Sequence, residues 1–129
     1  MSLYLPIVDR RVRFAVVGCG RISLNNIAAL EKHAERAQLV AVCDSDPVAL
    51  QAAVAKTGAL GFASYEELLA RSDADVVVLA TPSGLHAQQT VLAAKAGKHV
   101  MTEKPMATRW ADGRRMVEAC DKAGVRLFL

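Results

Sequence analysis

Cysteine is scarce in this 129-residue sequence, and the three present, Cys19, Cys43 and Cys120, have no metal-ligand spacing. An odd number without such spacing argues against a disulfide framework and a metal centre, so we expect buried free thiols in a reducing compartment. The sequence also lacks an apolar run of membrane-spanning length and the pattern of a signal peptide. These absences predict a cytoplasmic protein with no metal and no membrane partner.

Aromatic residues make up only 5% of the sequence, and none interleaves with the arginines that cluster near the start and late in the chain. The formal net charge of +3 is modest. Nucleic-acid-binding domains usually combine a stronger basic patch with stacking aromatic side chains. We therefore expect the arginines to form a solvated surface, and we predict no nucleic-acid partner.

No linker, repeat or low-complexity segment interrupts the sequence, and 53% of its residues are hydrophobic, enough for the core of one domain. We assign residues 1–11 to a leader, in which Pro6 prevents regular structure, and residues 12–129 to the domain. The chain ends at Leu129 inside an apolar segment, whereas natural ends are usually polar and exposed. We therefore expect a piece of a longer protein whose second domain is missing.

Short apolar, β-branched runs alternate with segments of helical spacing along the domain. The run at 75–80 is almost purely valine and leucine, which is typical of a strand buried on both faces of a parallel sheet. This alternation, with short connections, predicts a doubly wound α/β fold with strand order 3-2-1-4-5-6. The expected strands are 12–17, 38–43, 61–63, 75–80, 99–102 and 125–129, and the expected helices are 22–35, 47–57, 65–70, 85–96 and 109–123, the last capped by Thr108.

The domain is organised around the glycine turn that follows the first expected strand. Gly18 permits a tight turn from strand to helix, and Gly20 lets a pyrophosphate approach the backbone. Ser23 stands where the third glycine of the G-x-G-x-x-G pattern is usual, and it is still small enough for close packing of helix on strand. The N–H groups and the dipole of the helix start favour a phosphate there. An ordinary glycine turn has the same pattern, so other residues must decide between the two.

Asp44 lies just past the second expected strand, where an acidic side chain accepts hydrogen bonds from the adenosine ribose hydroxyls of a dinucleotide. The alternative is an aspartate that simply opens the turn before Asp46 and Pro47. A carboxylate at this position repels the 2′-phosphate of NADP, and no lysine or arginine follows nearby to accept one. NAD is therefore the expected cofactor.

Two further loops open at the same carboxyl edge of the sheet, where ligands bind in this fold. Thr81, Pro82 and Ser83 follow the fourth expected strand, and their hydroxyls and backbone would flank the nicotinamide half of the cofactor. His86 stands at the start of the next helix, where an isolated histidine is more often structural than functional.

Lys104 follows the fifth expected strand, between Glu103 and Pro105, whose ring fixes the backbone. A single amine beside the nicotinamide suits proton transfer or the orientation of a substrate hydroxyl. Without that context, a surface lysine paired with Glu103 would be the simpler interpretation. We take Lys104 as the candidate catalytic residue.

Together these residues resemble the Gfo/Idh/MocA oxidoreductase family. The resemblance rests on the glycine turn, on Asp44, on Thr81–Pro82 with His86, and on Glu103–Lys104–Pro105, and it covers the chain as that family's N-terminal NAD(P)-binding domain. More narrowly, the segments 18–22, 30–34 and 100–110 are similar to the UDP-N-acetylglucosaminuronic acid 3-dehydrogenases of lipopolysaccharide-sugar synthesis. In that branch NAD oxidises the sugar C3 hydroxyl to a ketone.

The resemblance implies a role for each candidate residue. The pyrophosphate would be held by the backbone at Gly18, Gly20, Arg21 and Ile22, and the adenosine ribose by Asp44. The nicotinamide side would be lined by Thr81, Pro82, Ser83, His86 and Glu103. Lys104 would orient the sugar hydroxyl. The family's nucleotide-sugar site and catalytic histidine belong to a C-terminal domain absent here, so we expect the fragment alone to bind NAD and to be inactive. The full-length enzyme is expected to be a homo-oligomer. Two alternatives stay open: another dehydrogenase of the family, acting on inositol or a free sugar, and a non-catalytic NAD-binding module.

Overall fold

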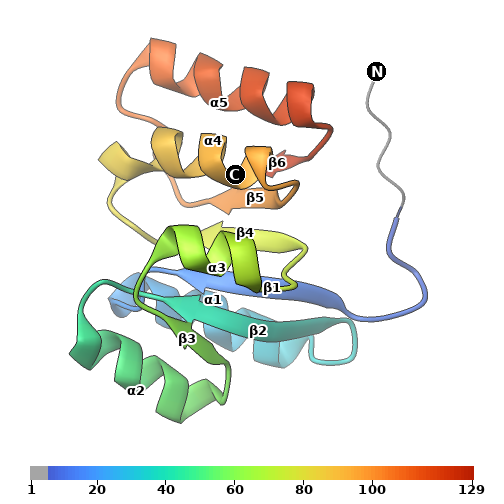
Figure 1. The fold of residues 1–129 in the computed structure, drawn as a ribbon, viewed down its shortest axis with the longest axis vertical. Helices are drawn as coiled ribbons and strands as arrows, with labels where there is room; N and C mark the ends of the chain where they lie inside the picture. Colours follow the sequence, from blue (N-terminus) through green and yellow to red (C-terminus); the bar gives the residue numbers. More distant parts are fainter. Residues whose placement is uncertain (1–5) are drawn as a thin grey trace.

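The computed structural model describes residues 6–129, which form a domain around a six-stranded sheet (Figure 1). All paired strands are parallel, and the order β3-β2-β1-β4-β5-β6 confirms the predicted doubly wound fold. The strands are β1 (Val12–Val17), β2 (Ala37–Cys43), β3 (Leu60–Phe62), β4 (Val76–Leu79), β5 (His99–Thr102) and β6 (Leu127–Phe128). The helices are α1 (Arg21–Lys32), α2 (Pro47–Thr57), α3 (Tyr65–Arg71), α4 (His86–Lys95) and α5 (Trp110–Ala123), with a short 3₁₀ helix at Ser83–Leu85.

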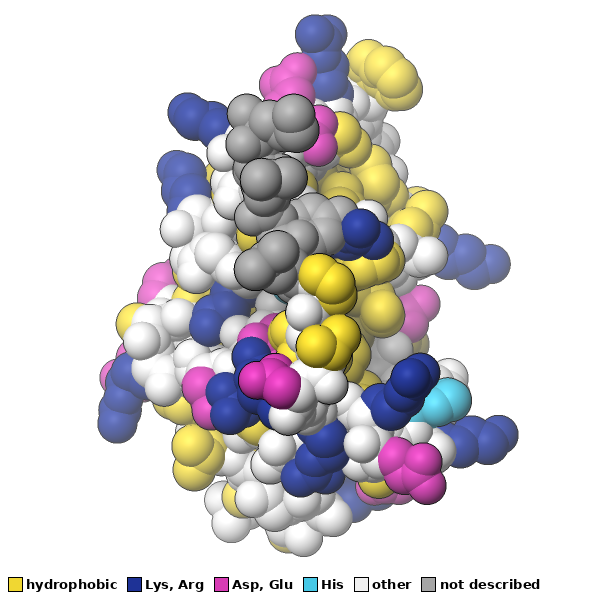
Figure 2. All heavy atoms as spheres, turned by 90° about the vertical axis from the view of Figure 1, so that its right-hand side faces the viewer, with side chains coloured by type: hydrophobic (Ala, Val, Ile, Leu, Met, Phe, Trp, Pro, Cys, Tyr) yellow, Lys and Arg dark blue, Asp and Glu magenta, His cyan; other side chains and the backbone are white. Residues whose placement is uncertain are grey.

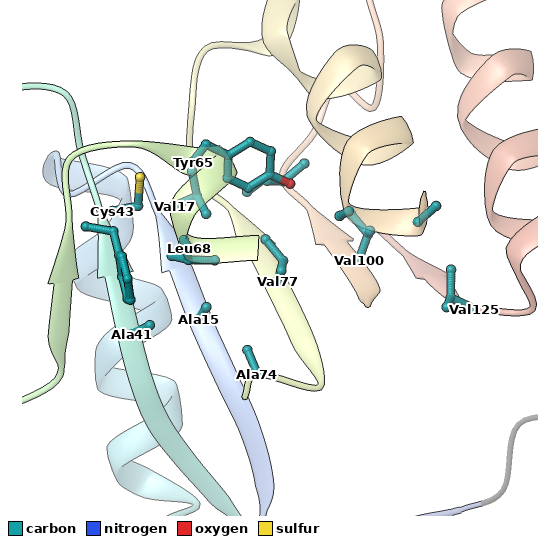
Figure 3. Close-up of a cluster of buried hydrophobic side chains, with 14 of the residues drawn as sticks. Ala15, Val17, Ala41, Cys43, Tyr65, Leu68, Ala74, Val77, Val100 and Val125 are labelled. Atoms are coloured by element: carbon teal, nitrogen blue, oxygen red, sulfur yellow. The ribbon is translucent and has the colours of Figure 1, made fainter. Parts of the chain in front are cut away.

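Each face of the sheet carries its own core, because alternate residues of a strand point to opposite faces. Val17 and Val77 belong to the cluster that side chains of α3, α4 and α5 cover (Figure 3). Val16 lies in the opposite cluster, where it packs with Ile27 of α1 and Ala53 of α2. All four residues of β4 are buried, which confirms that this valine-rich run is covered on both faces.

Two predicted helix starts are confirmed by their caps. The Asp46 side chain accepts a hydrogen bond from the Val48 N–H at 3.1 Å, and Pro47 follows it as the first residue of α2. The Ser64 hydroxyl accepts from the Glu67 N–H at 3.2 Å and so caps α3. Both helices therefore begin close to the carboxyl ends of the strands that precede them.

The prediction that Thr108 caps α5 is wrong. The helix begins at Trp110 with Arg109 in the cap position, and no side chain caps it. The first bond of the helix runs from the Gly113 N–H to the Arg109 carbonyl at 3.1 Å. A Cβ at Gly113 would lie 3.1 Å from the end of the Met106 side chain, so the preceding loop packs onto the first turn of α5. The start of α5 thus has loop packing beside it and no threonine cap.

Two other elements differ from the prediction by more than one residue at an end, and the remaining differences are of a single residue. The helix expected over 22–35 ends at Lys32. The strand expected over 125–129 is reduced to Leu127–Phe128, because the Val125 N–H donates to the Cys120 carbonyl at 3.0 Å and closes the end of α5. The proposed leader, residues 1–11, lies partly outside the described residues and stays a prediction. None of the described helices has the length and apolarity needed to span a membrane.

Asp75 joins the segment before β1 to the start of β4, at the amino edge of the sheet. Its two carboxylate oxygens accept hydrogen bonds from Arg10 at 2.8 and 2.9 Å, and one also accepts from the Arg13 N–H at 2.8 Å. The bond from Arg10 lowers the pKa of Asp75, burial opposes the shift, and the Arg13 N–H adds to it. Figure 2 shows basic and acidic side chains interspersed on this face of the molecule.

We expect Asp75→Asn to weaken the fold near neutral pH and to matter less in acid. A depressed folded-state pKa contributes stability above the unfolded-state value of about 3.9, and that stability is lost as the pH falls through the folded-state value. Because Arg10 is 37% exposed, solvent screening limits the loss to about 1 kcal/mol at neutral pH. Urea unfolding at neutral pH and below about pH 4 measures both values.

The matched control is Asp73→Asn, since Asp73 is 66% exposed and lies 3.5 Å from Arg13. It should change the free energy of unfolding less than Asp75→Asn does at neutral pH. A loss for Asp75→Asn that stays the same at both pH values would contradict the role given to its carboxylate.

Candidate functional site

A groove of about 480 Å³ opens at the carboxyl edge of the sheet, beside the ends of β1, β2 and β4. Cofactor sites usually enclose roughly 300–1,000 Å³. The lining residues are Val17, Gly18, Gly20, Cys43, Asp44, Ser45, Ala63, Tyr65, Ala80, Thr81, Pro82, Leu85 and Gln89. The fold thus brings together five of the predicted site residues, namely Gly18, Gly20, Asp44, Thr81 and Pro82.

Gly18 forms the contact between the loops that follow β1 and β4. Its φ is +92°, and a Cβ built on it would lie 2.6 Å from the Ala80 carbonyl oxygen. Its N–H donates to the Cys43 carbonyl at 2.7 Å, which joins the same turn to the end of β2. Both the backbone angle and the close approach require glycine at this position.

Gly20 leaves open space above the start of α1. A Cβ on Gly20 would meet no atom within 4 Å. Gly20 caps α1 without a side-chain hydrogen bond, so the N–H groups of the first turn, at Arg21 and Ile22, have no side-chain cap. Ser23 is buried, and its hydroxyl donates to the Gly20 carbonyl at 2.6 Å, which fixes the turn from below. An anionic group fits this arrangement of backbone donors.

Asp44 connects the glycine turn to the start of α2. One of its carboxylate oxygens accepts from the Cys19 N–H at 2.8 Å, and the other accepts from the Asp46 N–H at 2.9 Å. A carboxylate oxygen can accept more than one hydrogen bond, so both oxygens keep capacity for a ribose hydroxyl. No lysine or arginine is among the described residues that line the groove. The bonds by which Asp44 braces the glycine turn were not predicted.

Two hydrogen bonds that meet at Gln89 of α4 support the β4 loop, one directly and one through the helix. The Thr81 hydroxyl donates to the Gln89 side-chain oxygen at 2.5 Å. The Tyr65 hydroxyl donates to the Gln89 carbonyl at 2.7 Å, and Figure 3 shows the Tyr65 ring reaching from α3 toward α4. Burial raises the pKa of Tyr65 above its usual value, so the hydroxyl remains a donor. The loop that would flank the nicotinamide is therefore bonded to α4, and α4 is in turn bonded to α3.

Residues 12–129 match the model of an oxidoreductase family that has an NAD-binding Rossmann fold. The chain belongs to the Gfo/Idh/MocA oxidoreductase family. The predicted family is confirmed, and the described groove occupies the part of the fold in which such domains hold a dinucleotide.

Two solved structures of WlbA dehydrogenases are similar to this Gfo/Idh/MocA domain. The enzyme from Chromobacterium violaceum, in complex with NADH and UDP-GlcNAcA, is 61% identical with a TM-score of 0.97, over 99% of this chain and 37% of that chain. The enzyme from Bordetella pertussis, in complex with the same two molecules, is 62% identical with a TM-score of 0.94, over 95% of this chain and 36% of that chain.

Among curated relatives, D-apiose dehydrogenase of Paraburkholderia graminis is 36% identical over 93% of this chain and 32% of its own length. Inositol 2-dehydrogenase of Salmonella typhimurium is 33% identical over 90% of this chain and 35% of its own length. The chain thus spans about a third of the length of these Gfo/Idh/MocA relatives.

His86 lies behind the groove and not on its lining. The side chain is buried, with the residue only 1% exposed. Its Nε2 faces the Thr81 carbonyl at 2.9 Å, and its Nδ1 faces the carbonyls of Pro105 and Met106 at 3.2 and 3.3 Å. The ring therefore contacts the main chain of two loops of this Gfo/Idh/MocA domain.

Glu103 and Lys104 follow β5, next to the β4 loop but outside the lining of the groove. Lys104 is exposed and Glu103 is half-buried. The ion pairs of the described residues include no pair between them. The Lys104 side chain thus extends from the loop beside Pro105 without an ion pair to its acidic neighbour.

Cys19 and Cys43 are free thiols, as predicted; Cys43 is buried as expected, whereas Cys19 is only partly buried. Burial and the nearby Asp44 carboxylate raise the pKa of Cys19 to about 11. Burial, with a smaller effect of neighbouring Cys19, raises the pKa of Cys43 to about 12. Thiols with such pKa values stay protonated at neutral pH and are poor nucleophiles. The described residues contain no cluster of three or more histidine, cysteine or acidic side chains suited to a metal ion.

Sequence reasoning missed the groove residues Tyr65 and Gln89. Tyr65 directly follows a helix cap at the carboxyl end of β3, which is a position where the sheet edge is expected to carry ligand contacts. Gln89 lies about one helical turn beyond His86, so the two residues share a face of α4. This spacing could have indicated that Gln89 also points toward the β4 loop. The hydrogen bond between them joins α3 to α4, and no sequence pattern around either residue indicates it.

Proposed function

We propose that this chain is the NAD-binding part of a dehydrogenase that oxidises the C3 hydroxyl of UDP-N-acetylglucosaminuronic acid. The observation that carries the proposal is the 61% identity, over 99% of this chain, to a dehydrogenase solved with NADH and UDP-GlcNAcA. Because the chain covers 37% of that relative, we assign the sugar site and the general acid/base to sequence beyond this chain.

The glycine turn holds the pyrophosphate in this proposal. The open space above Gly20 and the uncapped first turn of α1 support it, since the N–H groups at Arg21 and Ile22 point toward a bound anion. Gly18 keeps the turn against the β4 loop. Asp44 accepts hydrogen bonds from the adenosine ribose and favours NAD over NADP, because its charge repels a 2′-phosphate.

The loops after β4 and β5 flank the nicotinamide. Thr81, Pro82, Ser83 and Glu103 lie along it, and the Lys104 amine donates to the C3 hydroxyl and orients it. Bound NAD supplies the hydride acceptor. In the overall reaction the sugar gives a hydride from C3 to NAD and a proton from its hydroxyl to a base, which leaves a ketone and NADH.

The proposed role of Lys104 is tested in the full-length enzyme that carries this domain. Lys104→Ala should lower kcat roughly 10²- to 10⁴-fold and leave the Kd for NAD nearly unchanged, because the amine acts on the hydroxyl and not on the cofactor. Lys95→Ala, at the exposed end of α4, is the matched control and should keep the wild-type rate. A Lys104→Ala enzyme that also keeps the wild-type rate would remove Lys104 from the reaction.

A second candidate is a dehydrogenase of inositol or of a free sugar. The D-apiose and inositol dehydrogenases among the relatives favour it. Their identities of 36% and 33% are lower than the 61% that supports the first candidate. Rates of the full-length enzyme with UDP-sugars, free sugars and inositols separate the two. A non-catalytic NAD-binding module would show no turnover with any of them.

We also propose that the enzyme works in the cytoplasm, where the three free cysteines would remain reduced. That the full-length enzyme is a homo-oligomer stays a prediction from the resemblance. Sedimentation of the full-length enzyme tests it.

A further inference from the structure

The loops after β4 and β5 are neighbours, because these two strands pair in parallel from Val76 opposite His99 to Leu79 opposite Thr102. One loop lines the groove with Thr81 and Pro82. The other carries Lys104. In the proposed function these loops form one subsite, so the distance between them decides whether the amine reaches a hydroxyl beside the nicotinamide.

His86 contacts the backbone of both loops from beneath. The Nε2 of its buried ring is 2.9 Å from the Thr81 carbonyl oxygen, and Nδ1 is 3.2 Å from that of Pro105 and 3.3 Å from that of Met106. Carbonyl oxygens only accept hydrogen bonds, so a neutral ring bonds one loop through its single N–H, and a ring protonated on both nitrogens bonds both loops. The ring therefore lies between the two loops, with one nitrogen near the Thr81 carbonyl and the other near the carbonyls of Pro105 and Met106.

The β4 loop is bonded to α4 through a second residue besides His86. The contact described between α4 and the loop after β5 is made by the His86 ring. Gln89 accepts from the Thr81 hydroxyl, and Tyr65 holds the Gln89 carbonyl. Loss of the His86 ring would leave Thr81 attached to α4 and would take away the contact between α4 and the carbonyls of Pro105 and Met106. The loop that carries Lys104 should then shift relative to the groove.

The half of the groove assigned to adenosine and pyrophosphate is built without His86. The Gly18 N–H donates to the Cys43 carbonyl, and Asp44 accepts from the N–H groups of Cys19 and Asp46. These bonds join β1, β2 and α2, none of which carries His86. A change at His86 should therefore affect one half of the cofactor and spare the other.

We propose that His86 is a positioning residue that sets the nicotinamide half of the site by fixing the β4 loop to the Lys104 loop. It touches neither cofactor nor substrate. The inference rests on the proposed function, because it assigns the two loops to the nicotinamide. It differs from the sequence-based expectation, in which His86 lay along the nicotinamide itself.

The test compares NADH with ADP-ribose, which lacks the nicotinamide, on the 129-residue chain. Calorimetry gives both affinities, and the fluorescence of bound NADH reports the surroundings of the nicotinamide. His86→Ala should weaken NADH binding roughly tenfold, the loss expected for one buried hydrogen bond, and should reduce the fluorescence change on binding. ADP-ribose should bind as it does to wild type. Gln88→Ala, an exposed neighbour on α4, is the control and should change neither ligand.

His86→Gln provides a milder variant that retains a side-chain donor for one loop. It should fall between wild type and His86→Ala for NADH. Equal losses for NADH and ADP-ribose in both variants, or no loss for either ligand, would overturn the positioning role. A wild-type chain that bound neither ligand would instead overturn the proposed function, and this inference with it.

Discussion

Replacing Gly18 by alanine should lower the free energy of unfolding by roughly 2–4 kcal/mol and abolish measurable NAD binding. The backbone at Gly18 has a φ of +92°, which L-residues rarely adopt. The added Cβ would also lie 2.6 Å from the Ala80 carbonyl oxygen, which is backbone and cannot rotate away. The β1 turn and the β4 loop would have to separate, and the groove lies between them. Urea unfolding and calorimetry with NAD measure the two effects.

The matched control is Gly20→Ala, because the second glycine of the same turn has a different requirement. A Cβ at Gly20 would meet no atom within 4 Å, so the fold should lose no more than about 1 kcal/mol, the scale of a weakened helix cap. NAD binding should nevertheless weaken, because the methyl group occupies the space proposed for the pyrophosphate. Gly20→Ala with full NAD affinity would contradict that placement, and Gly18→Ala with wild-type stability would contradict the described turn.

Asp44→Ala should weaken NAD binding roughly 10- to 100-fold and reduce the preference for NAD over NADP. The substitution removes the charged group that we propose as the acceptor of the ribose hydroxyls, and hydrogen bonds to charged groups contribute about 1.5–3 kcal/mol. It also removes the acceptor for the N–H groups of Cys19 and Asp46, which brace the glycine turn. NADP should lose less affinity than NAD, because the charge that repels its 2′-phosphate disappears as well.

Asp46→Ala separates cofactor recognition from local stability. Asp46 caps α2 through its bond to the Val48 N–H, so its loss should cost about 1 kcal/mol of stability. Its effect on the NAD and NADP affinities should be small. If Asp46→Ala and Asp44→Ala reduced NAD binding to the same extent, the ribose assignment of Asp44 would be wrong.

The sheet and the glycine turn could be predicted because their signals are local. A valine-rich run such as that of β4 indicates a strand buried on both faces, and all four residues of β4 are buried. The G-x-G spacing after a strand predicted a turn that needs glycine at Gly18, and the φ of +92° agrees. Asp44 was placed at the carboxyl edge from strand position alone, and it lines the groove.

The rest depended on contacts between segments far apart in the chain. The bonds of His86 to the carbonyls of Pro105 and Met106 span 19 and 20 residues, and no pattern around His86 indicates them. The bond from Tyr65 to Gln89 spans 24 residues. The Thr108 cap was predicted from the local preference of threonine alone, whereas the helix begins one residue later, at Trp110 after Arg109, where the preceding loop lies against its first turn.

The most direct test of NAD binding at this groove is a calorimetric titration of the wild-type chain with NAD and, separately, with NADP. We predict one site per chain that binds NAD at least roughly tenfold more tightly than NADP, because in the proposed function the Asp44 carboxylate lies beside the adenosine ribose and repels a 2′-phosphate. Binding of both cofactors with equal affinity, or of neither, would contradict the account.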